Sequence, residues 1–127
     1  MFLLFADLDN MKWINDTLAH QEGDLALIAT SAILKQTFRD SDIFARIGGD
    51  EFVVLTTEVR EDNADILSQR FQKNLDAYNE LEKRPYTLMV SVGIARYEPE
   101  NPCSIGELLS RADALMYEQK HKKGLTR

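Results

Sequence analysis

The sequence has little of the chemistry that holds many small proteins together. Its 127 residues include one cysteine, Cys103, and only two histidines. A single cysteine excludes an internal disulfide and fits a reducing compartment, so we expect a cytoplasmic location. A structural zinc cluster is excluded as well, because it needs several Cys and His ligands.

Long apolar runs, repeats and low-complexity segments are also missing. The opening run, residues 2–6, is too short to span a membrane or to form a signal peptide. A net charge of -6 argues against an extended nucleic-acid surface. Nucleotide binding remains open, because metal ions and local arginines can neutralise phosphates. At 44% hydrophobic and 28% charged residues, the chain has the composition of one soluble domain with one core.

Strand patterns occur in three places. Residues 2–6 are continuously apolar, as in a strand buried on both faces. Residues 43–57 form two apolar runs around a Gly-Gly turn, which predicts a hairpin. Residues 87–95 are apolar or small on both faces, which predicts a central strand covered on both sides.

Helical patterns fill the segments between these strands. We predict a short helix over residues 10–17 and a longer one that Asp24 opens. Asp62 is the predicted N-cap of a third helix, and Ser104 with Glu107 forms a capping box for a fourth. The expected inward residues are, for the second helix, Leu25, Ile28, Ala29, Ala32 and Ile33; for the third, Leu67, Phe71, Leu75 and Tyr78; and for the fourth, Ile105, Leu108, Ala112, Leu115 and Met116.

The predicted order is therefore β-α-α-β-β-α-β-α. A hairpin in the middle makes the sheet at least partly antiparallel. We predict an α+β fold with a mixed, largely antiparallel central sheet and helices on both faces, close to the ferredoxin-like split pattern. Short linkers indicate a single domain over residues 1–127.

Two carboxylates stand at the tip of the hairpin, in Gly48-Gly49-Asp50-Glu51-Phe52. Glycines allow positive φ and close approach of another molecule, while neighbouring acids repel each other unless a cation lies between them. Asp7 follows the first strand and can converge with the tip at one sheet edge. Two carboxylates and a main-chain carbonyl suit Mg²⁺. Because extended neighbours point to opposite sides, we expect Asp50 rather than Glu51 to share the metal with Asp7.

Two other interpretations of these acids are possible. Any one acid alone is more typical of a solvated turn, where Asp is common, but the acids taken together with the glycines favour the metal site. An EF-hand over residues 7–18 fails, because Lys12 stands where the loop needs Gly and Leu18 where it needs Glu.

Residues 48–52 spell the signature of the GGDEF family of diguanylate cyclases. Residues 7–16, Asp-Leu-Asp-Asn-Met-Lys-Trp-Ile-Asn-Asp, and residues 20–24, His-Gln-Glu-Gly-Asp, resemble the family's other main signature. Met11 replaces its usual Phe and Ala19 its usual Gly, and we expect both changes to be mild. Residues 91–95 and 112–117 also look like family segments, so the chain is identified as a member along its whole length.

The resemblance implies that two GTP molecules are joined into cyclic di-GMP with release of two pyrophosphates. It implies a fold similar to nucleotidyl cyclases and polymerase palms, and Mg²⁺ or Mn²⁺ as cofactor. The implied metal ligands are Asp7, the Leu8 carbonyl and Asp50, and the implied catalytic acids are Asp50 and Glu51.

The same resemblance implies residues that hold the nucleotide. Asn15 and Asp24 would read the guanine edge, and Gly48 and Gly49 would let the backbone meet the phosphates. Lys120 matches the family's tail lysine. His20 would approach the nucleotide or act as a helix-capping or core histidine, and Lys12 would contact phosphate or lie on the surface.

An inhibitory product site is implied by Arg39-Asp40-Ser41-Asp42, an RxxD pattern five residues before the glycine pair. The Arg39 guanidinium would grip the phosphate and guanine of cyclic di-GMP, with Asp42 beside it. Arg70 would join from the neighbouring helix, or else lie on a solvated helix face.

Two departures from the family pattern stand at the ends. The usual D-x-L-T…N-R segment before the first strand is not in this sequence, which we interpret as excision from a longer sensor protein. In the tail the glycine comes one residue late, at Gly124, and no Arg-Asn follows. Triphosphate binding could then depend partly on Lys123.

Three functions are compatible with these residues. The first is a cyclase active as a homodimer, in which each copy holds one GTP. The second is a catalytically weak module that binds GTP or cyclic di-GMP and regulates a partner, which the altered tail favours. The third is a structural dimerisation domain, which leaves the converging acids unexplained.

Overall fold

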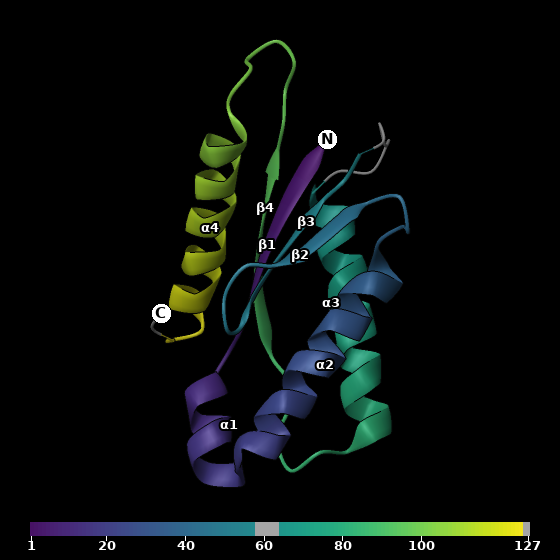
Figure 1. Cartoon of the computed structure of the whole chain (residues 1–127), viewed down its shortest axis with the longest axis vertical. Coiled ribbons are helices and arrows are strands. Elements are labelled where there is room, and N and C mark those ends of the chain that lie inside the picture. The colour runs from purple at the N-terminus through teal and green to yellow at the C-terminus, as the bar shows by residue number, and fades with distance from the viewer. Residues whose placement is uncertain (58–63, 126–127) are drawn as a thin grey trace.

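The computed structural model describes residues 1–57 and 64–125. Strands and helices follow each other in the predicted order (Figure 1). The elements are β1 (Phe2–Leu8), α1 (Met11–Leu18), α2 (His20–Thr37), β2 (Ile43–Arg46), β3 (Glu51–Leu55), α3 (Ala64–Glu82), β4 (Val90–Arg96) and α4 (Ile105–Lys122).

The four strands form one sheet in the order β2-β3-β1-β4. All three strand pairings within the described residues are antiparallel. Strand β3 thus lies between β1 and β2, which is the split arrangement that the sequence predicts. The register places Asp7 of β1 opposite Glu51 of β3 on one side and Ser91 of β4 on the other.

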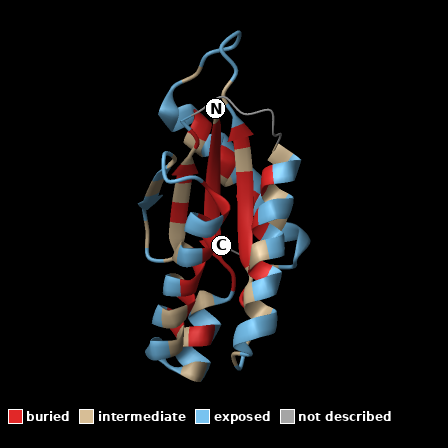
Figure 2. Ribbon diagram, turned by 90° about the vertical axis from the view of Figure 1, so that its right-hand side faces the viewer, coloured by how far each residue is buried: buried red, intermediate tan, exposed pale blue. Residues whose placement is uncertain are grey.

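Side chains of β1 alternate between two apolar layers. Leu4, Ala6 and Leu8 pack with residues of α2 and α3, whereas Leu3 and Phe5 pack with residues of α4. Helices therefore cover both faces of the sheet, as predicted, and buried residues run along the strands (Figure 2). Since Asp7 continues the alternation of Leu3 and Phe5, it lies on the face that α4 covers.

The faces of α2 and α4 were predicted only in part. Ile28 is 65% exposed and Ala32 is exposed, while Ala26, Ala29, Ile33 and Leu34 are buried. In α4, Ile105 and Leu115 are exposed, while Leu108, Ala112 and Met116 are buried, as predicted. Both helices carry more apolar residues than one face needs, so spacing alone did not identify which of them pack inward.

Two boundaries differ from the predicted ones, and a third lies outside the described residues. Helix α2 begins at His20, not at Asp24, because the chain turns at Ala19 with φ 91. Strand β4 begins at Val90, not at residue 87, because Leu88 exchanges two backbone hydrogen bonds with the Asn79 side chain, at 2.8 and 2.9 Å. The predicted cap at Asp62 lies outside the described residues, but the α3 stripe of Leu67, Phe71 and Leu75 is buried.

Helix α4 lies very close to the sheet at Gly93 of β4. A Cβ atom there would overlap the backbone of α4 at the Ala112 oxygen and the Met116 nitrogen. The glycine therefore sets how near α4 lies to the sheet, and with it the position of Lys120 one helical turn beyond Met116.

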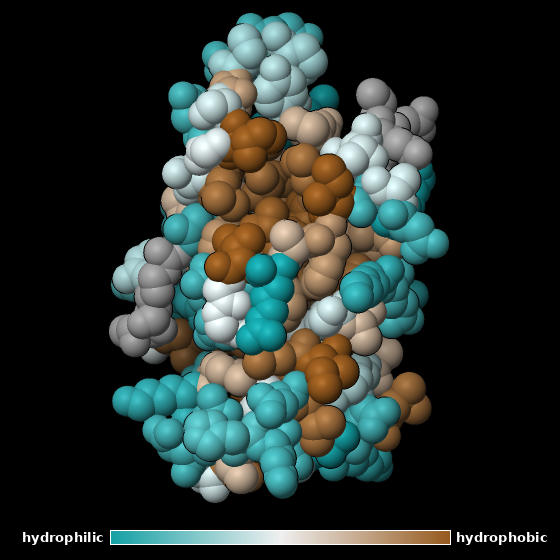
Figure 3. Space-filling view, viewed as in Figure 1, coloured by the Kyte–Doolittle hydropathy of each residue, from teal (hydrophilic) through white to brown (hydrophobic). Residues whose placement is uncertain are grey.

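Helix α4 packs mainly on β4 and β1. It does not cover the part of the same sheet face that β3 forms. On the surface in Figure 3, apolar side chains gather over the sheet beside α4. Partly buried Val53, Leu55 and Leu109 belong to this layer, and Ile43 is exposed. Within the described residues, no helix has the length and apolar character needed to cross a bilayer.

Candidate active site

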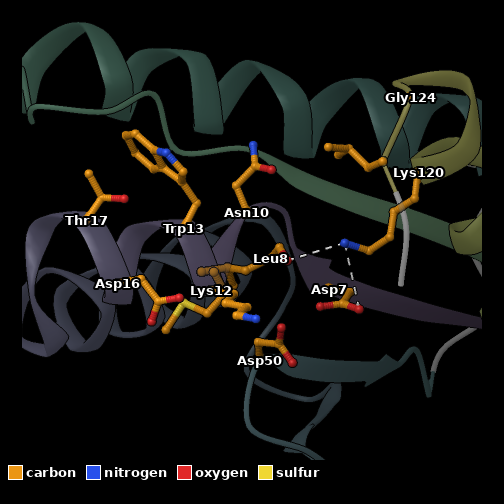
Figure 4. A pocket seen from close by; sticks show the side chains of 12 residues that line it. Asp7, Leu8, Asn10, Lys12, Trp13, Asp16, Thr17, Asp50, Lys120 and Gly124 are labelled. Atoms are coloured by element: carbon orange, nitrogen blue, oxygen red, sulfur yellow. Dashed lines mark hydrogen bonds and ion pairs between the residues drawn. The ribbon is translucent and has the colours of Figure 1, made fainter.

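A cleft of about 660 Å³ opens where β1 ends beside the tip of the β2–β3 hairpin. The Leu8 amide donates to the Asp50 carbonyl at 3.1 Å, which joins the end of β1 to the tip. Figure 4 shows Asp7 and Asp50 facing one another, with Lys120 reaching in from α4. The lining residues are Asp7, Leu8, Asn10, Met11, Lys12, Trp13, Asp16, Thr17, Asp50, Lys120, Gly124 and Leu125.

Asp7 is a buried acid in an unfavourable environment. It is 6% exposed, and its Oδ1 atom is buried with no hydrogen-bond partner among the described residues. Burial raises the pKa of Asp7 to about 7, opposed by the nearby Lys120 ammonium and reinforced by the negative charges of Asp50 and Glu51. Such an oxygen is expected to bind a cation.

Lys120 is the cation on the opposite wall of the cleft, and it is 3% exposed. Its Nζ donates to Asp9 Oδ1 at 2.8 Å and to the Leu8 carbonyl at 3.3 Å, and it lies 3.9 Å from Asp7 Oδ2. The ammonium thus joins the C-terminal part of α4 to the end of β1.

Asp9 is the anchor of this network. Its Oδ2 accepts from Lys123 Nζ at 2.8 Å. The Ser91 hydroxyl lies 2.8 Å from Asp9 Oδ1 and 3.0 Å from Asp9 Oδ2 and donates to the carboxylate. Burial alone would raise the pKa of Asp9, but the hydrogen bonds from Lys120, Lys123 and Ser91 lower it below its ordinary value. Asp9 is therefore a fully partnered carboxylate, in contrast to Asp7.

The tail after α4 explains how Lys123 reaches Asp9. Gly124 adopts φ 75, and the Leu125 amide donates to the Lys120 carbonyl at 3.0 Å, closing the helix. Lys123 also donates to Ser91 Oγ at 3.1 Å, and it is not among the cleft-lining residues. The contacts of Lys123 therefore go to Asp9 and to Val90 and Ser91 of β4.

The residues at the strand ends fit a divalent metal ion. Asp7 with its unpartnered buried oxygen, the Leu8 carbonyl and Asp50 are hard oxygen donors, the kind that Mg²⁺ and Mn²⁺ bind. Within the described residues no three His, Cys, Asp or Glu side chains form a metal-binding group. Two carboxylates and a carbonyl would leave positions for water and for substrate phosphate.

Glu51 is nearer to Asp7 than the alternation argument suggested. The sheet register puts Glu51, not Asp50, directly opposite Asp7. Asp50 reaches the cleft because it lies in the turn, outside the regular alternation, and its charge affects Asp7 more than that of Glu51 does. Both acids therefore lie at the predicted sheet edge.

The glycines of the hairpin turn are used for space rather than for positive φ. Among the described glycines, only Gly124 has a positive φ, so Gly48 and Gly49 do not. Arg46 donates to both of their carbonyls, at 3.1 and 2.6 Å. A Cβ at Gly49 would meet nothing within 4 Å, so this backbone is accessible to a ligand.

The predicted base-reading residues lie on α1 and α2, outside the described lining of the cleft. Asn15 is half-buried, and its Oδ1 lies so near Gly23 that a Cβ there would overlap it. Asp24 is exposed one residue further along α2. His20 is exposed at the start of α2, so it is not a core histidine. Of the other predicted binding residues, Lys12 and Lys120 line the cleft.

The predicted product site is a turn between α2 and β2. The Asp42 carboxylate accepts from the Arg39 amide at 3.0 Å and from the Thr57 amide at 3.4 Å, so Asp42 also stabilises the turn. Arg39 and Asp42 line a hollow of about 210 Å³. Arg70 is exposed on α3 and is not among the residues that line it.

Some residues of the site were missed from the sequence. In the sequence, Asp9 and Ser91 were recognised only as parts of motifs and not as site residues. Trp13, which is 51% exposed, lines the cleft and was not predicted to do so. The signal for Asp9 was its spacing of two from Asp7, which places both side chains on the same face of an extended chain.

Comparisons with known proteins agree with this arrangement. The family described as "Diguanylate cyclase, GGDEF domain" matches residues 1–125. Cyclic di-GMP phosphodiesterase NbdA of Pseudomonas aeruginosa is 37% identical over 118 residues, 93% of this chain and 15% of that protein. Diguanylate cyclase DgcP of Escherichia coli is 36% identical over 127 residues, 97% of this chain and 36% of that protein.

Among solved structures, the isolated GGDEF domain of TpbB (YfiN) from Pseudomonas aeruginosa has a TM-score of 0.81 at 34% identity. The match covers 95% of this chain and 71% of that one. The chain spans 15% and 36% of the two curated relatives. The family match along nearly the whole chain, the shared fold and the Gly-Gly-Asp-Glu-Phe turn beside Asp7 together show that this chain belongs to the GGDEF family.

Proposed function

We propose that this domain joins two GTP molecules into cyclic di-GMP and releases two pyrophosphates. The observation that carries the proposal is the pairing of Asp7 and Asp50 at one sheet edge, with a buried Asp7 oxygen that lacks a partner within the described residues. The cleft beside them has a volume suited to a nucleotide and a buried lysine on its wall.

Several groups of this chain would take separate roles in the reaction. Asp50 accepts the proton of the attacking 3′-hydroxyl, assisted by Glu51, and the α-phosphate loses pyrophosphate as the new phosphodiester bond forms. Lys12 and Lys120 offset the charge of the triphosphate. Gly48 and Gly49 let it approach the turn backbone. A divalent ion held by Asp7, the Leu8 carbonyl and Asp50 would supply further charge neutralisation at the phosphates.

The reaction requires two copies of the domain. One cleft holds one GTP, and ring closure needs the 3′-hydroxyl of each nucleotide at the α-phosphate of the other. We infer a homodimer with the clefts face to face. The single cysteine fits the cytoplasm as its location, and other domains of a longer protein would control the encounter.

Guanine selection is assigned to Asn15 and Asp24. A carboxylate accepts from the N1–H and N2–H₂ donors of guanine, and adenine would leave it unpaired at a cost of about 1–3 kcal/mol. Asp24→Ser should relax the preference, measured as competition between GTP and ATP. An unchanged ratio would remove Asp24 from this role.

The decisive experiment replaces Asp50. Asp50→Asn removes one of two carboxylates and should abolish the formation of cyclic di-GMP from GTP with Mg²⁺ or Mn²⁺. Chromatography measures the product. Thermal unfolding should change little, because the acid lies on a turn. The matched control is Asp65→Asn, an exposed acid on α3, which should keep full activity. Equal turnover by wild type and Asp50→Asn would refute the assignment.

A second candidate is a regulatory module that binds GTP or cyclic di-GMP without turnover. It is favoured by the similarity to NbdA, a protein named for phosphodiesterase activity, and by the altered tail. Calorimetric binding of GTP with no product formed by the wild type at any concentration would select this candidate.

The product site is proposed at the turn of Arg39 and Asp42, with Arg70 as a further contact. Arg39→Ala removes a guanidinium but keeps the backbone amide that Asp42 accepts from, so the turn should survive. It should weaken cyclic di-GMP binding and spare GTP binding. Equal cyclic di-GMP affinity in both forms would make this an ordinary surface turn.

A further inference from the structure

The Lys120 ammonium contacts both groups of β1 that we assign to the metal. Its Nζ is 3.3 Å from the Leu8 carbonyl and 3.9 Å from Asp7 Oδ2 (Figure 4). We propose that Lys120 makes divalent-metal binding conditional on the triphosphate, so that metal and nucleotide load together. This inference rests on the proposed GTP site and adds its order of assembly.

The reason is the repulsion between two cations that share ligands. A divalent ion held by Asp7 and the Leu8 carbonyl would share these groups with Nζ, which already lies 3.9 Å from Asp7 Oδ2 and 3.3 Å from that carbonyl. Lys120 is 3% exposed, so solvent does little to screen this repulsion. Without nucleotide, the metal would therefore bind weakly.

The network around Asp9 prevents the lysine from moving aside. Asp9 holds Nζ at 2.8 Å and is itself fixed by Lys123 at 2.8 Å and by the Ser91 hydroxyl. Asp9 is thus a positioning residue, which keeps a positive charge at the end of β1. Because its own charge is matched by two lysines, it offers no free carboxylate to the metal.

A triphosphate reverses the balance. Its oxygens carry negative charge into the space between the ammonium and the metal position, where each cation is attracted to the same phosphates. Repulsion becomes shared attraction, and by linkage the metal must strengthen nucleotide binding by the factor by which nucleotide strengthens metal binding.

The test measures Mn²⁺ affinity by electron paramagnetic resonance at one fixed pH, with and without a non-hydrolysable GTP analogue, after subtraction of the Mn²⁺ that free analogue binds without protein. In the wild type, the analogue should raise Mn²⁺ affinity roughly tenfold or more. Lys120→Met should raise the nucleotide-free Mn²⁺ affinity roughly tenfold while weakening analogue binding. A residue with only a structural role would not shift the two affinities in opposite directions.

Two variants control for charge and for helix context. Lys120→Arg keeps the charge and should keep the weak nucleotide-free Mn²⁺ binding. Lys122→Met makes the same change on the exposed side of α4 and should match the wild type. Circular dichroism checks that each variant is folded.

The proposal is overturned if wild-type protein binds the analogue but binds Mn²⁺ equally well with and without it. That comparison decides even if Lys120→Met does not fold. It is also overturned if folded Lys120→Met shows unchanged or weaker nucleotide-free Mn²⁺ affinity. Failure of the wild type to bind the analogue at all would instead refute the proposed function, and the nucleotide-free comparison of the variants would still decide on Lys120.

Discussion

Asp7 provides a carboxylate for the proposed metal site, and burying that carboxylate lowers the stability of the fold. Its pKa rises from 3.8 to about 7 on folding, mainly because burial removes water from the carboxylate. Below 3.8 both states are protonated, and this acid contributes nothing to the pH dependence. Between 3.8 and about 7 the unfolded chain ionises first, so stability falls as pH rises. Above that range the loss is complete, on the order of 4 kcal/mol.

Asp7→Asn should therefore stabilise the domain at neutral and alkaline pH. An amide keeps the shape without the buried charge, so the midpoint of urea unfolding at about pH 8 should rise. The variant should also lose most of the decline in stability between about pH 4 and pH 7. Asp16→Asn, an exposed acid of the same cleft, serves as control and should leave the pH profile unchanged. A variant that is less stable than wild type at pH 8 would contradict this account.

The backbone at Ala19 is strained, which argues against the expectation of a mild change. The replacement of the usual glycine was expected to be mild, but Ala19 has φ 91 and ψ 155, a conformation that residues with a Cβ rarely adopt. Ala19→Gly should stabilise the domain by about 1–3 kcal/mol in urea unfolding. Ala32→Gly, on the exposed face of α2, should instead destabilise it by about 0.5–1 kcal/mol. Two substitutions of the same kind with the same sign would refute the strain.

At the scale of elements, the contact between α4 and β4 controls the site. Gly93→Ala would force α4 away from the sheet, because the overlapping atoms belong to the helix backbone and cannot rotate away. We expect a loss of about 1–3 kcal/mol or more. Gly49→Ala is the matched control, since a Cβ there meets nothing within 4 Å. The free energy of unfolding of this variant should equal that of the wild type. A neutral Gly93→Ala would show that α4 can shift without penalty.

The elements that could be predicted are those whose pattern is unambiguous. Residues 2–6 of β1 are apolar throughout, and the stripe of α3 repeats at three- and four-residue spacing, so both were identified from sequence. Helix α2 offers apolar residues on several sides, and only packing in the shared core selects Ala26 and Leu34 over Ile28.

The residues of the candidate site also fall into those that could be predicted from the sequence and those that could not. Asp7 and Asp50 could be predicted because each stands at the end of a strand pattern. The ion pair of Asp9 and Lys120 joins residues 111 positions apart, and no local pattern reports it. It depends on how closely α4 lies on β4, which Gly93 decides.

At the scale of the whole molecule, the site occupies one end of the sheet. The end of β1, the hairpin tip and the last turn of α4 meet there, and α1 forms the outer wall (Figure 1). A cleft at one end can face its copy without moving the core. Under the proposed function, the domain would supply the groups for one nucleotide, and catalysis would need a second copy facing it.

Activity should therefore depend on enforced proximity. We predict that the isolated chain at low micromolar concentration is mostly monomeric and slow, and that a parallel coiled coil fused before β1 accelerates cyclic di-GMP formation. The fusion converts an encounter in solution into one at an effective concentration on the order of millimolar. The measurement is initial rate against protein concentration: the isolated chain should show a second-order dependence and the fusion a first-order one. The control is the same fusion with prolines in the coiled coil, which should stay monomeric and slow. An isolated monomer as fast as the fusion would mean that one domain completes the reaction without a facing partner.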